Sequence, residues 1–193
     1  ASRGIGRAVA LAFAEKSASK NNHKEYNIFV NCAKNSELLE NVKKQIRDLG
    51  VCCESFTGDI SDYNTAMEMF DEVHRHFGNV DILVNNAGLI KRNDAIDFTE
   101  DEWDSVIQVN QKMVFFLSQA FAKQYIKQGH GGKIININSM LSYQGGIRVP
   151  SYTASKSAGM GLTKAMCNEW ACHNINVNAI APGYMATNNT AQL

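Results

Sequence analysis

Short apolar runs alternate along the chain with longer segments of helical pattern, and this alternation limits the folds that the sequence can adopt. The runs are apolar on both faces, which is typical of buried parallel strands. Helix signals fill the segments between them: Ser36 can cap a helix that stops at Gly50, and Thr99 with Glu102 forms a capping-box pattern. The pattern predicts an α/β fold, a doubly wound parallel sheet with helices on both faces. The expected strands are 27–32, 51–56, 80–84, 133–138 and 175–181, and the expected helices are 8–15, 37–49, 62–77, 102–127 and 151–173.

Length and charge fit a single globular domain. The chain has 193 residues, which we expect to form one domain over 1–193. Its 19 basic residues balance 19 acidic ones, so no partner of strong opposite charge, such as a nucleic acid, is indicated. No apolar run approaches the length of a membrane span. The five cysteines show no zinc-ligand spacing and no accompanying histidine cluster, so we expect no metal, and a cytoplasmic location.

Tyr152 and Lys156 carry the most specific chemical signal. On a helix, side chains four residues apart lie on one face, so the phenol and the ammonium group are neighbours. A neighbouring cation lowers the pKa of a phenol, which would let Tyr152 exchange a proton with a carbonyl or hydroxyl oxygen. Such pairs are common on exposed helix faces. The pair gains weight from Ser139, which follows the apolar run 133–138 at the strand end where sites of α/β sheets lie.

Glycines and polar residues mark other turns of the same kind. Gly4 and Gly6 lead directly into a helix, so backbone N–H groups there can approach a pyrophosphate, although a glycine pair alone is weak evidence. Asp59 and its neighbour Ile60, the segment 85–88 and the segment 182–183 each follow an expected strand. This repeated placement at carboxyl ends of strands predicts one shared binding edge.

Gly4-Ile5-Gly6, Asn85-Asn86-Ala87-Gly88, Asn110, Ser139, Tyr-x-x-x-Lys and Pro-Gly-x-x-x-Thr together resemble the motifs of the short-chain dehydrogenase/reductase family along the whole chain. The resemblance implies a Rossmann-like fold and hydride transfer between a nicotinamide coenzyme and a carbonyl/alcohol pair. It implies that Tyr152 is the general acid/base and that Lys156 lowers the pKa of Tyr152 and binds the nicotinamide ribose. Ser139 would position the substrate oxygen, and Asn110 would hold a water in a proton relay.

The same resemblance places the coenzyme along the strand ends. Asp59 and Ile60 are expected at the adenine, 86–88 at the adenosine ribose, and 182–187 around the nicotinamide amide. The full set of expected coenzyme contacts is Ser2, Arg3, Gly4, Ile5, Gly6, Lys34, Asp59, Ile60, Asn86, Ala87, Gly88, Tyr152, Lys156, Pro182, Gly183, Met185 and Thr187.

Charge near the second strand of such a fold bears on the choice of coenzyme. NAD-preferring proteins place an acidic residue at the end of that strand, where it binds the ribose 2′-OH and repels a 2′-phosphate. Cys32 occupies this position here, Lys34 follows it, and Arg3 lies in the glycine turn. We therefore favour NADP(H), with NAD(H) as the alternative. Lys34 can equally be an ordinary solvated charge.

The substrate is indicated by resemblance within the family. From about Asp81 on, the chain resembles 2-dehydro-3-deoxy-D-gluconate 5-dehydrogenases. Before that residue it resembles 3-oxoacyl-carrier-protein reductases, so reduction of a 3-oxoacyl group on a carrier protein is the alternative function. A sugar acid carries a carboxylate, for which a bidentate arginine is suited. Arg148 is the expected carboxylate ligand, helped by Lys91 or Arg92. The alternative is that all three are ordinary solvent-exposed side chains on loops, without a role in binding. The full set of expected substrate contacts is Ser139, Gln144, Arg148 and Tyr152.

Three further expectations concern the chain as a whole. The family's first strand and C-terminal tail are missing, so the sequence is expected to be part of a longer protein. The resemblance implies a homo-oligomer, a tetramer formed through the two long helices that end near Lys127 and His173. Besides an active enzyme, a relative that binds coenzyme without chemistry and an inactive fragment or fusion stay open as alternatives.

Overall fold

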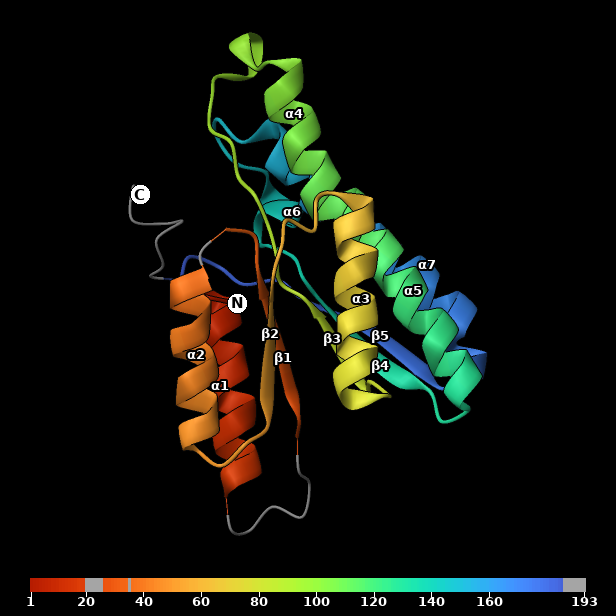
Figure 1. Cartoon of the computed structure of the whole chain (residues 1–193). Coiled ribbons are helices and arrows are strands. Elements are labelled where there is room, and N and C mark those ends of the chain that lie inside the picture. Colours follow the sequence, from red (N-terminus) through yellow and green to blue (C-terminus); the bar gives the residue numbers. More distant parts are fainter. Residues whose placement is uncertain (20–25, 35, 186–193) are drawn as a thin grey trace. The chain divides into compact units, whose positions relative to one another are not determined.

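The structure, a computed structural model, describes residues 1–19, 26–34 and 36–185 (Figure 1). Contacts divide the chain into two compact units, Ala1–Gly78 and Asn79–Leu193. Each unit has its own parallel sheet, one with two strands and one with three. The expected α/β class with parallel strands is confirmed, but the described strands form two sheets where the sequence predicted one. The prediction of one domain over 1–193 stays a prediction.

In its described residues, the first unit alternates three helices with two strands. Its strands pair in parallel, with Ile28 opposite Cys53 and Cys32 opposite Thr57. Asp62 caps the third helix, because its carboxylate accepts a hydrogen bond from the Thr65 backbone at 2.8 Å. The elements are α1 (Gly4–Ala18), β1 (Ile28–Cys32), α2 (Ser36–Asp48), β2 (Cys53–Thr57) and α3 (Tyr63–Phe77).

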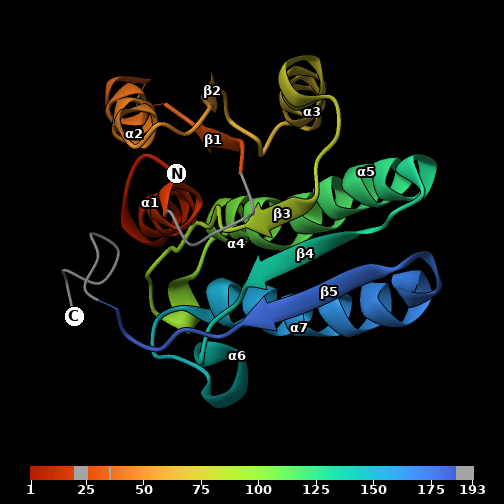
Figure 2. The same cartoon turned by 90° about the horizontal axis from the view of Figure 1, so that it is seen from below.

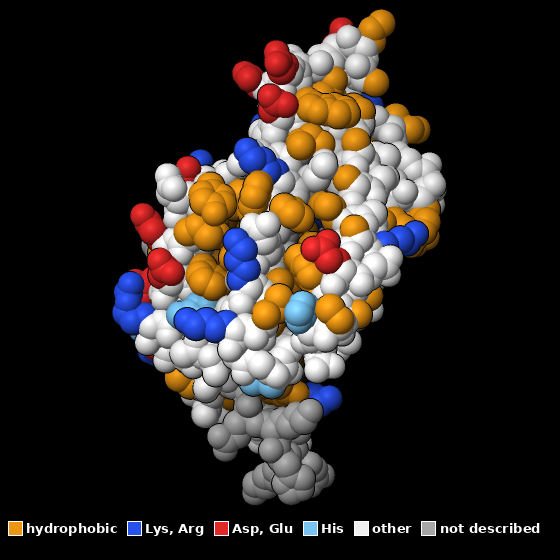
Figure 3. All heavy atoms as spheres, turned by 90° about the vertical axis from the view of Figure 1, so that its right-hand side faces the viewer, with side chains coloured by type: hydrophobic (Ala, Val, Ile, Leu, Met, Phe, Trp, Pro, Cys, Tyr) orange, Lys and Arg blue, Asp and Glu red, His pale blue; other side chains and the backbone are white. Residues whose placement is uncertain are grey.

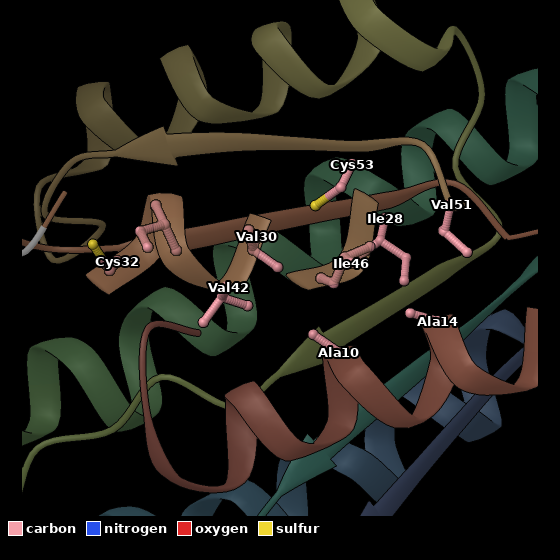
Figure 4. Close-up of a cluster of buried hydrophobic side chains, with 10 residues drawn as sticks. Ala10, Ala14, Ile28, Val30, Cys32, Val42, Ile46, Val51 and Cys53 are labelled. Carbon is pink, nitrogen blue, oxygen red and sulfur yellow. The ribbon is translucent and has the colours of Figure 1, made fainter. Parts of the chain in front are cut away.

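Small and branched apolar side chains fill the core between α1, α2 and the sheet of this unit (Figure 4). Alternate residues of β1 point into this core, and the intervening Phe29 packs edge-on against Phe77 of α3 with ring centroids 6.4 Å apart. Helices therefore cover both faces of β1, as expected for a doubly wound arrangement. The core residues are Ala10, Ala14, Ile28, Val30, Cys32, Leu39, Val42, Ile46, Val51 and Cys53.

The second unit holds a parallel sheet with the strand order β3-β4-β5 (Figure 2). The helices α5 and α7 pack against this sheet and against each other. Its elements are β3 (Ile82–Asn85), η1 (Ala95–Asp97), α4 (Glu100–Ile107), the π-helix η2 (Gln108–Lys112), α5 (Met113–Gln128), β4 (Gly132–Ile137), α6 (Leu141–Gln144), α7 (Pro150–Trp170), η3 (Ala171–His173) and β5 (Ile175–Ile180).

The helix expected over 102–127 is the main local difference. It begins as predicted, because Thr99 and Glu102 form a capping box with both hydrogen bonds present. A π-helical turn then interrupts it at Gln108–Lys112, and Asn110 lies within that turn. Such turns add a residue to the helical register and occur often at functional sites. Among the helices in the described ranges, none is long and apolar enough to cross a membrane.

Candidate active site

The carboxyl ends of β4 and β5 are joined by backbone hydrogen bonds. The Asn138 N–H donates to the Ile180 carbonyl at 2.7 Å, and the Met140 N–H donates to the Pro182 carbonyl at 3.0 Å. Ser139 lies between these two bonds and is 9 % exposed. The structure therefore places Ser139 beside the segment that begins at Pro182, as the sequence predicted for strand ends.

Lys156 is buried on α7 with its ammonium group close to the phenol ring of Tyr152. Its Nζ lies 5.7 Å from the ring centroid and donates to the Ile137 carbonyl at 2.6 Å. The side chain is only 5 % exposed. This burial lowers the pKa of Lys156 to about 8, because desolvation disfavours the charged form.

The buried ammonium makes the stability of the protein depend on pH. Between the folded pKa of about 8 and the ordinary value of 10.5, the unfolded chain binds more protons than the folded chain, so stability rises with pH in this window. Between about pH 7.5 and about pH 9.5, we expect wild type to gain about 1 to 2 kcal/mol of unfolding free energy relative to Lys156→Met. Urea unfolding at both pH values measures this difference. Lys164 is an exposed lysine on the same helix, and Lys164→Met is the control. An equal gain in the unfolding free energy of wild type relative to Lys164→Met would contradict the prediction.

The pKa of Tyr152 differs in direction from the prediction. Burial raises it, and this outweighs a hydrogen bond from the Ser139 side chain and the charge of Arg92, which both lower it. The sequence predicted that Lys156 would lower this pKa. The lysine ammonium lies over the ring and donates its hydrogen bond to the Ile137 carbonyl. Burial of the phenol is the largest cause of the shift in its pKa. At neutral pH the phenol therefore keeps its proton and can donate it.

The side chain of Asn110, in the π-helical turn, makes hydrogen bonds to two other segments of the chain. Its Oδ1 accepts from the Leu89 N–H at 2.8 Å, and its Nδ2 donates to the Leu89 carbonyl at 2.8 Å. The same Nδ2 donates to the Ser155 hydroxyl at 3.1 Å. Ser155 precedes Lys156 on α7 and was missed from sequence, because a serine inside a helix gives no signal of its own. Asn110 thus joins the turn after β3 to the helix that carries Tyr152.

The turn after β3 passes close to these residues. A Cβ atom on Gly88 would lie 3.5 Å from Asn110 Oδ1 and 3.6 Å from Lys156 Nζ, so a side chain here would fill the space beside both groups. Asn86 and Ala87 precede it in the same turn, and Gly183 and Met185 follow Pro182 on exposed backbone. Thr187 lies outside the described residues. The open turn beside a buried ammonium fits an oxygen-rich coenzyme.

In the first unit, the start of α1 lies beside the carboxyl end of β1. The Ala1 amino group donates to the Asn31 carbonyl, and Gly4 has a left-handed backbone with φ of 57° that suits glycine. No side chain caps the helix at Arg3, and its first turn holds no acidic residue. These unclaimed N–H groups fit an anion such as a pyrophosphate. Ser2, Ile5 and Gly6 complete this turn.

Residues after β1 and β2 meet at the same strand ends. The Gly58 N–H donates to the Cys32 carbonyl at 2.9 Å, and the Asn31 amide donates to the Phe56 and Gly58 carbonyls. Lys34 is exposed just beyond Cys32. Asp59 accepts a hydrogen bond from the Ser61 N–H, and Ile60 is half-buried beside it.

The remaining expected substrate residues are Gln144, in α6, and Arg148, in the loop between α6 and α7. Gln144 is the exposed last residue of α6. Arg148 has a left-handed backbone with φ of 62°, and its Nε lies 2.8 Å from Asp94 Oδ1. Asp94 was missed from sequence, because it is distant along the chain and belongs to no motif. Arg148 therefore has an intramolecular partner for its charge.

The comparisons with known proteins agree with this site. The family model of the short chain dehydrogenases matches residues 1–193. A 2-dehydro-3-deoxy-D-gluconate 5-dehydrogenase of Dickeya dadantii is 55% identical over 190 residues, which cover 98% of this chain and 71% of that protein. A 3-oxoacyl-acyl-carrier-protein reductase of Staphylococcus epidermidis is 38% identical over 193 residues, covering 100% of this chain and 75% of that protein.

A solved structure extends the likeness to the fold. A protein of Agrobacterium tumefaciens, described as a 2-deoxy-D-gluconate 3-dehydrogenase with bound NADP, is 42% identical with a TM-score of 0.80. The match covers 100% of this chain and 72% of that one. With its motifs, strand-end site and fold in agreement with these relatives, the chain belongs to the short chain dehydrogenase family and is an oxidoreductase that uses a nicotinamide coenzyme.

Proposed function

We propose that this oxidoreductase acts on a keto-sugar acid such as 2-dehydro-3-deoxy-D-gluconate. The observation that carries the proposal is the 55% identity to the Dickeya dadantii dehydrogenase that is named for this substrate. The alignment extends over 98% of the chain and so includes the site residues of both units. The site supports it with a buried lysine and a protonated tyrosine beside a strand-end serine.

In the proposed mechanism, the side chains of the second unit handle the proton. The coenzyme supplies or accepts the hydride when bound. Ser139 positions the substrate oxygen, and Tyr152 donates its proton to that oxygen as negative charge develops. Lys156 keeps a positive charge near the phenol below its pKa of about 8. Asn110 fixes the relative positions of the turn after β3 and of α7. In the oxidative direction Tyr152 receives the proton.

Coenzyme residues are proposed in both units. Ser2 to Gly6 and Lys34 would bind phosphates, Asp59 and Ile60 the adenine, and the turn 86–88 the adenosine ribose. Tyr152, Lys156 and the segment from Pro182 through Gly183 and Met185 would bind the nicotinamide end. We propose a preference for NADP(H), because the strand-end position holds Cys32 and not an acid. The Agrobacterium tumefaciens protein with bound NADP supports this choice.

Reversing the charge at Arg3 tests the coenzyme preference. Removing one charged contact to a phosphate costs about 1.5 to 3 kcal/mol, so Arg3→Glu should weaken NADPH binding about 10- to 100-fold and NADH binding only a few-fold. The thermal shift produced by each coenzyme measures the two affinities. Arg7 is an exposed arginine in the first turn of α1 whose side chain donates to Gln45, and Arg7→Glu is the matched control. Equal losses of both coenzymes would refute the assignment.

A 3-oxoacyl-carrier-protein reductase is the second candidate, because a relative of that name is 38% identical over the whole chain. Steady-state assays with 2-dehydro-3-deoxy-D-gluconate and with a 3-oxoacyl thioester separate the two. We expect kcat/KM for the sugar acid to exceed that for the thioester by at least about 100-fold, which is a difference of about 2.7 kcal/mol in transition-state binding. The reverse ratio would favour the acyl reductase.

We also propose that the protein forms a homotetramer in the cytoplasm. Figure 3 shows the side of the molecule on which α5 and α7 lie in Figure 1, and hydrophobic side chains are spread over it between scattered charged groups. Half-buried Phe115 and Phe116 of α5 and the exposed Trp103 of α4 are apolar residues in this part of the chain. Aromatic side chains at a protein surface are enriched at subunit interfaces.

A further inference from the structure

One stripe along α7 carries the two proposed reacting groups of this helix and two further residues. The stripe consists of Tyr152, Lys156, Gly159 and Thr163, whose spacings of four, three and four residues place them on one side of a helix. Lys156 Nζ donates to the Ile137 carbonyl at the end of β4. Gly159 and Thr163 also contact this end of the sheet, as the next paragraphs describe. The stripe therefore connects the proton donor to contacts further along the helix.

Thr163, at the far end of the stripe, belongs to a buried row of four hydrogen-bonded residues. Asn136 Nδ2 donates to Thr163 Oγ1 at 2.9 Å. Asn85 Nδ2 donates to Asn136 Oδ1 at 2.9 Å and to Ser118 Oγ at 3.0 Å. Asn85 and Asn136 are opposite each other in the pairing of β3 with β4, and all four side chains are buried. The buried row thus runs from α5 through both strands to α7.

Only one arrangement of these groups satisfies the buried row. Each hydroxyl gives its single hydrogen to the carbonyl four residues earlier in its own helix, at 2.6 Å for Ser118 and 2.7 Å for Thr163. Both hydroxyls can therefore only accept from the asparagines, so Asn136 must turn its amide nitrogen to Thr163 and its oxygen to Asn85. Sliding of α7 along β4 would leave buried donors without acceptors, which is costly. The buried row therefore fixes the height of α7 along β4.

Gly159 lets α7 approach the end of β4 closely in the middle of the stripe. A Cβ atom on this residue would lie 2.5 Å from Asn138 Oδ1, closer than nonbonded atoms come, so a side chain would push the two segments apart. Asn138 is buried, its N–H is bound to the Ile180 carbonyl, and Ser139 follows it directly. A Cβ atom on Gly161 of the same helix would meet nothing within 4 Å. The distance between α7 and the segment of Ser139 therefore depends on Gly159.

We propose that Thr163, Asn136 and Gly159 are positioning residues for the reaction. Together they set the height and the spacing of α7 on β4, so that Tyr152 reaches the oxygen that Ser139 holds. This inference rests on the proposed roles of Tyr152 and Ser139. Reacting atoms must approach to about 3 to 3.5 Å, and a displacement of about 1 Å can cost about 100-fold in rate. Residues that touch no substrate can therefore control turnover through the placement of the helix.

The two glycines of α7 provide a matched test of the spacing. Gly159→Ala and Gly161→Ala add the same methyl group to the same helix, but only the first would meet another atom. With saturating coenzyme and 2-dehydro-3-deoxy-D-gluconate, kcat of Gly159→Ala should fall about 10- to 100-fold, and that of Gly161→Ala should stay within about two-fold of wild type. Asn138→Ala in the Gly159→Ala background removes the obstructing oxygen and should regain most of this loss. Equal rates for the two glycine variants would overturn the proposal.

The threonine variants test the buried row without inserting an atom, and they decide the proposal if Gly159→Ala does not fold. Thr163→Val keeps the shape of the side chain but leaves the Asn136 amide without its acceptor, so kcat should fall about 10-fold. Thr163→Ser keeps the hydroxyl and should stay within about three-fold of wild type. Ser118→Ala removes the equivalent hydroxyl from α5, which carries none of the proposed reacting groups, and should also stay within about three-fold. Equal losses of kcat in Thr163→Val and Ser118→Ala would mean that the buried row serves folding alone.

Two further comparisons separate positioning from loss of the fold and from the proposed substrate. The thermal shift caused by NADPH should be largely retained in Gly159→Ala and Thr163→Val, because most of the proposed coenzyme contacts lie outside α7. A parallel loss of this shift and of kcat would show general damage and would overturn the positioning role. If wild type does not turn over the sugar acid, the substrate proposal fails, and the same ratios of kcat are measured with the 3-oxoacyl thioester.

Discussion

Replacing Tyr152 by Phe should remove turnover and leave coenzyme binding in place. Proton transfer by a positioned side chain contributes about 10²- to 10⁴-fold to a rate, and we expect kcat to fall by that factor in either direction of the reaction. The phenol keeps its proton at neutral pH, because burial raises its pKa. In the proposed mechanism it is the proton donor that a developing alkoxide would meet, and phenylalanine preserves its packing but not its proton.

The thermal shift caused by NADPH separates lost chemistry from lost folding. In Tyr152→Phe most of this shift should remain, because the hydroxyl is one of many proposed coenzyme contacts and a neutral hydrogen bond contributes only about 0.5 to 1.5 kcal/mol to the affinity that sets the shift. Tyr63→Phe, an exposed tyrosine at the start of α3, is the control and should keep full activity. Unchanged turnover in Tyr152→Phe would mean that Tyr152 is not the proton donor.

The positions of Ser139, Tyr152 and Lys156 could be predicted from sequence because each depends on local pattern. Strand ends follow from apolar runs, and the four-residue spacing of a helix follows from its pitch. The structure places all three in one unit, with Ser139 close enough to lower the pKa of the phenol and Lys156 over its ring. The direction of the pKa shift was wrong because it depends on burial, which only the tertiary structure determines.

The π-helical turn at Asn110 could not be predicted. The apolar spacing from Trp103 to Phe121 is that of one continuous helix, and one extra residue in a turn hardly changes it. The turn becomes understandable only through the Asn110 amide, which binds both backbone groups of Leu89. A contact between segments that are distant in sequence has no local signal, and the ion pair of Arg148 with Asp94 escaped prediction for the same reason.

Sequence patterning also does not reveal how strands group into sheets. The five expected strands are all present among the described residues, each within two residues of its predicted bounds. Their apolar runs show that they are buried, but pairing partners depend on backbone contacts across the fold. The described strands pair as β1-β2 and as β3-β4-β5, one sheet to each unit.

Asn110→Leu should cost both stability and activity, because leucine fills the volume and satisfies none of the hydrogen bonds. The asparagine side chain is 2 % exposed and makes three of them. Buried groups left without partners cost about 1 to 3 kcal/mol each, so we expect unfolding free energy to fall by about 3 kcal/mol or more. Displacement of the turn and of α7 should lower kcat about 100-fold, as small misplacements of reacting groups do. Urea unfolding and steady-state rates measure the two losses.

Asn110→Asp separates the donor from the acceptor role of this side chain. Aspartate can still accept from the Leu89 N–H, but an ionised carboxylate would face the Leu89 carbonyl and could no longer donate to Ser155. Its folded pKa should therefore lie above the ordinary value of about 4. Between those two values the folded chain binds more protons than the unfolded chain, so the stability of this variant relative to wild type should fall as pH rises.

The exposed Asn176 offers the matched control. Its side-chain oxygen accepts a hydrogen bond from Lys133 Nζ at 2.9 Å, so Asn176→Asp places a carboxylate beside a cation in solvent. An attraction there depresses the pKa of the carboxyl group, and the relative stability of that variant should hold or rise as pH increases from about 5 to about 8. Opposite slopes for the two aspartates would assign the loss at Asn110 to its buried amide donors. Parallel slopes would mean that the turn after β3 tolerates a charge. They would also mean that the hydrogen bonds of Asn110 do not hold this turn to α7.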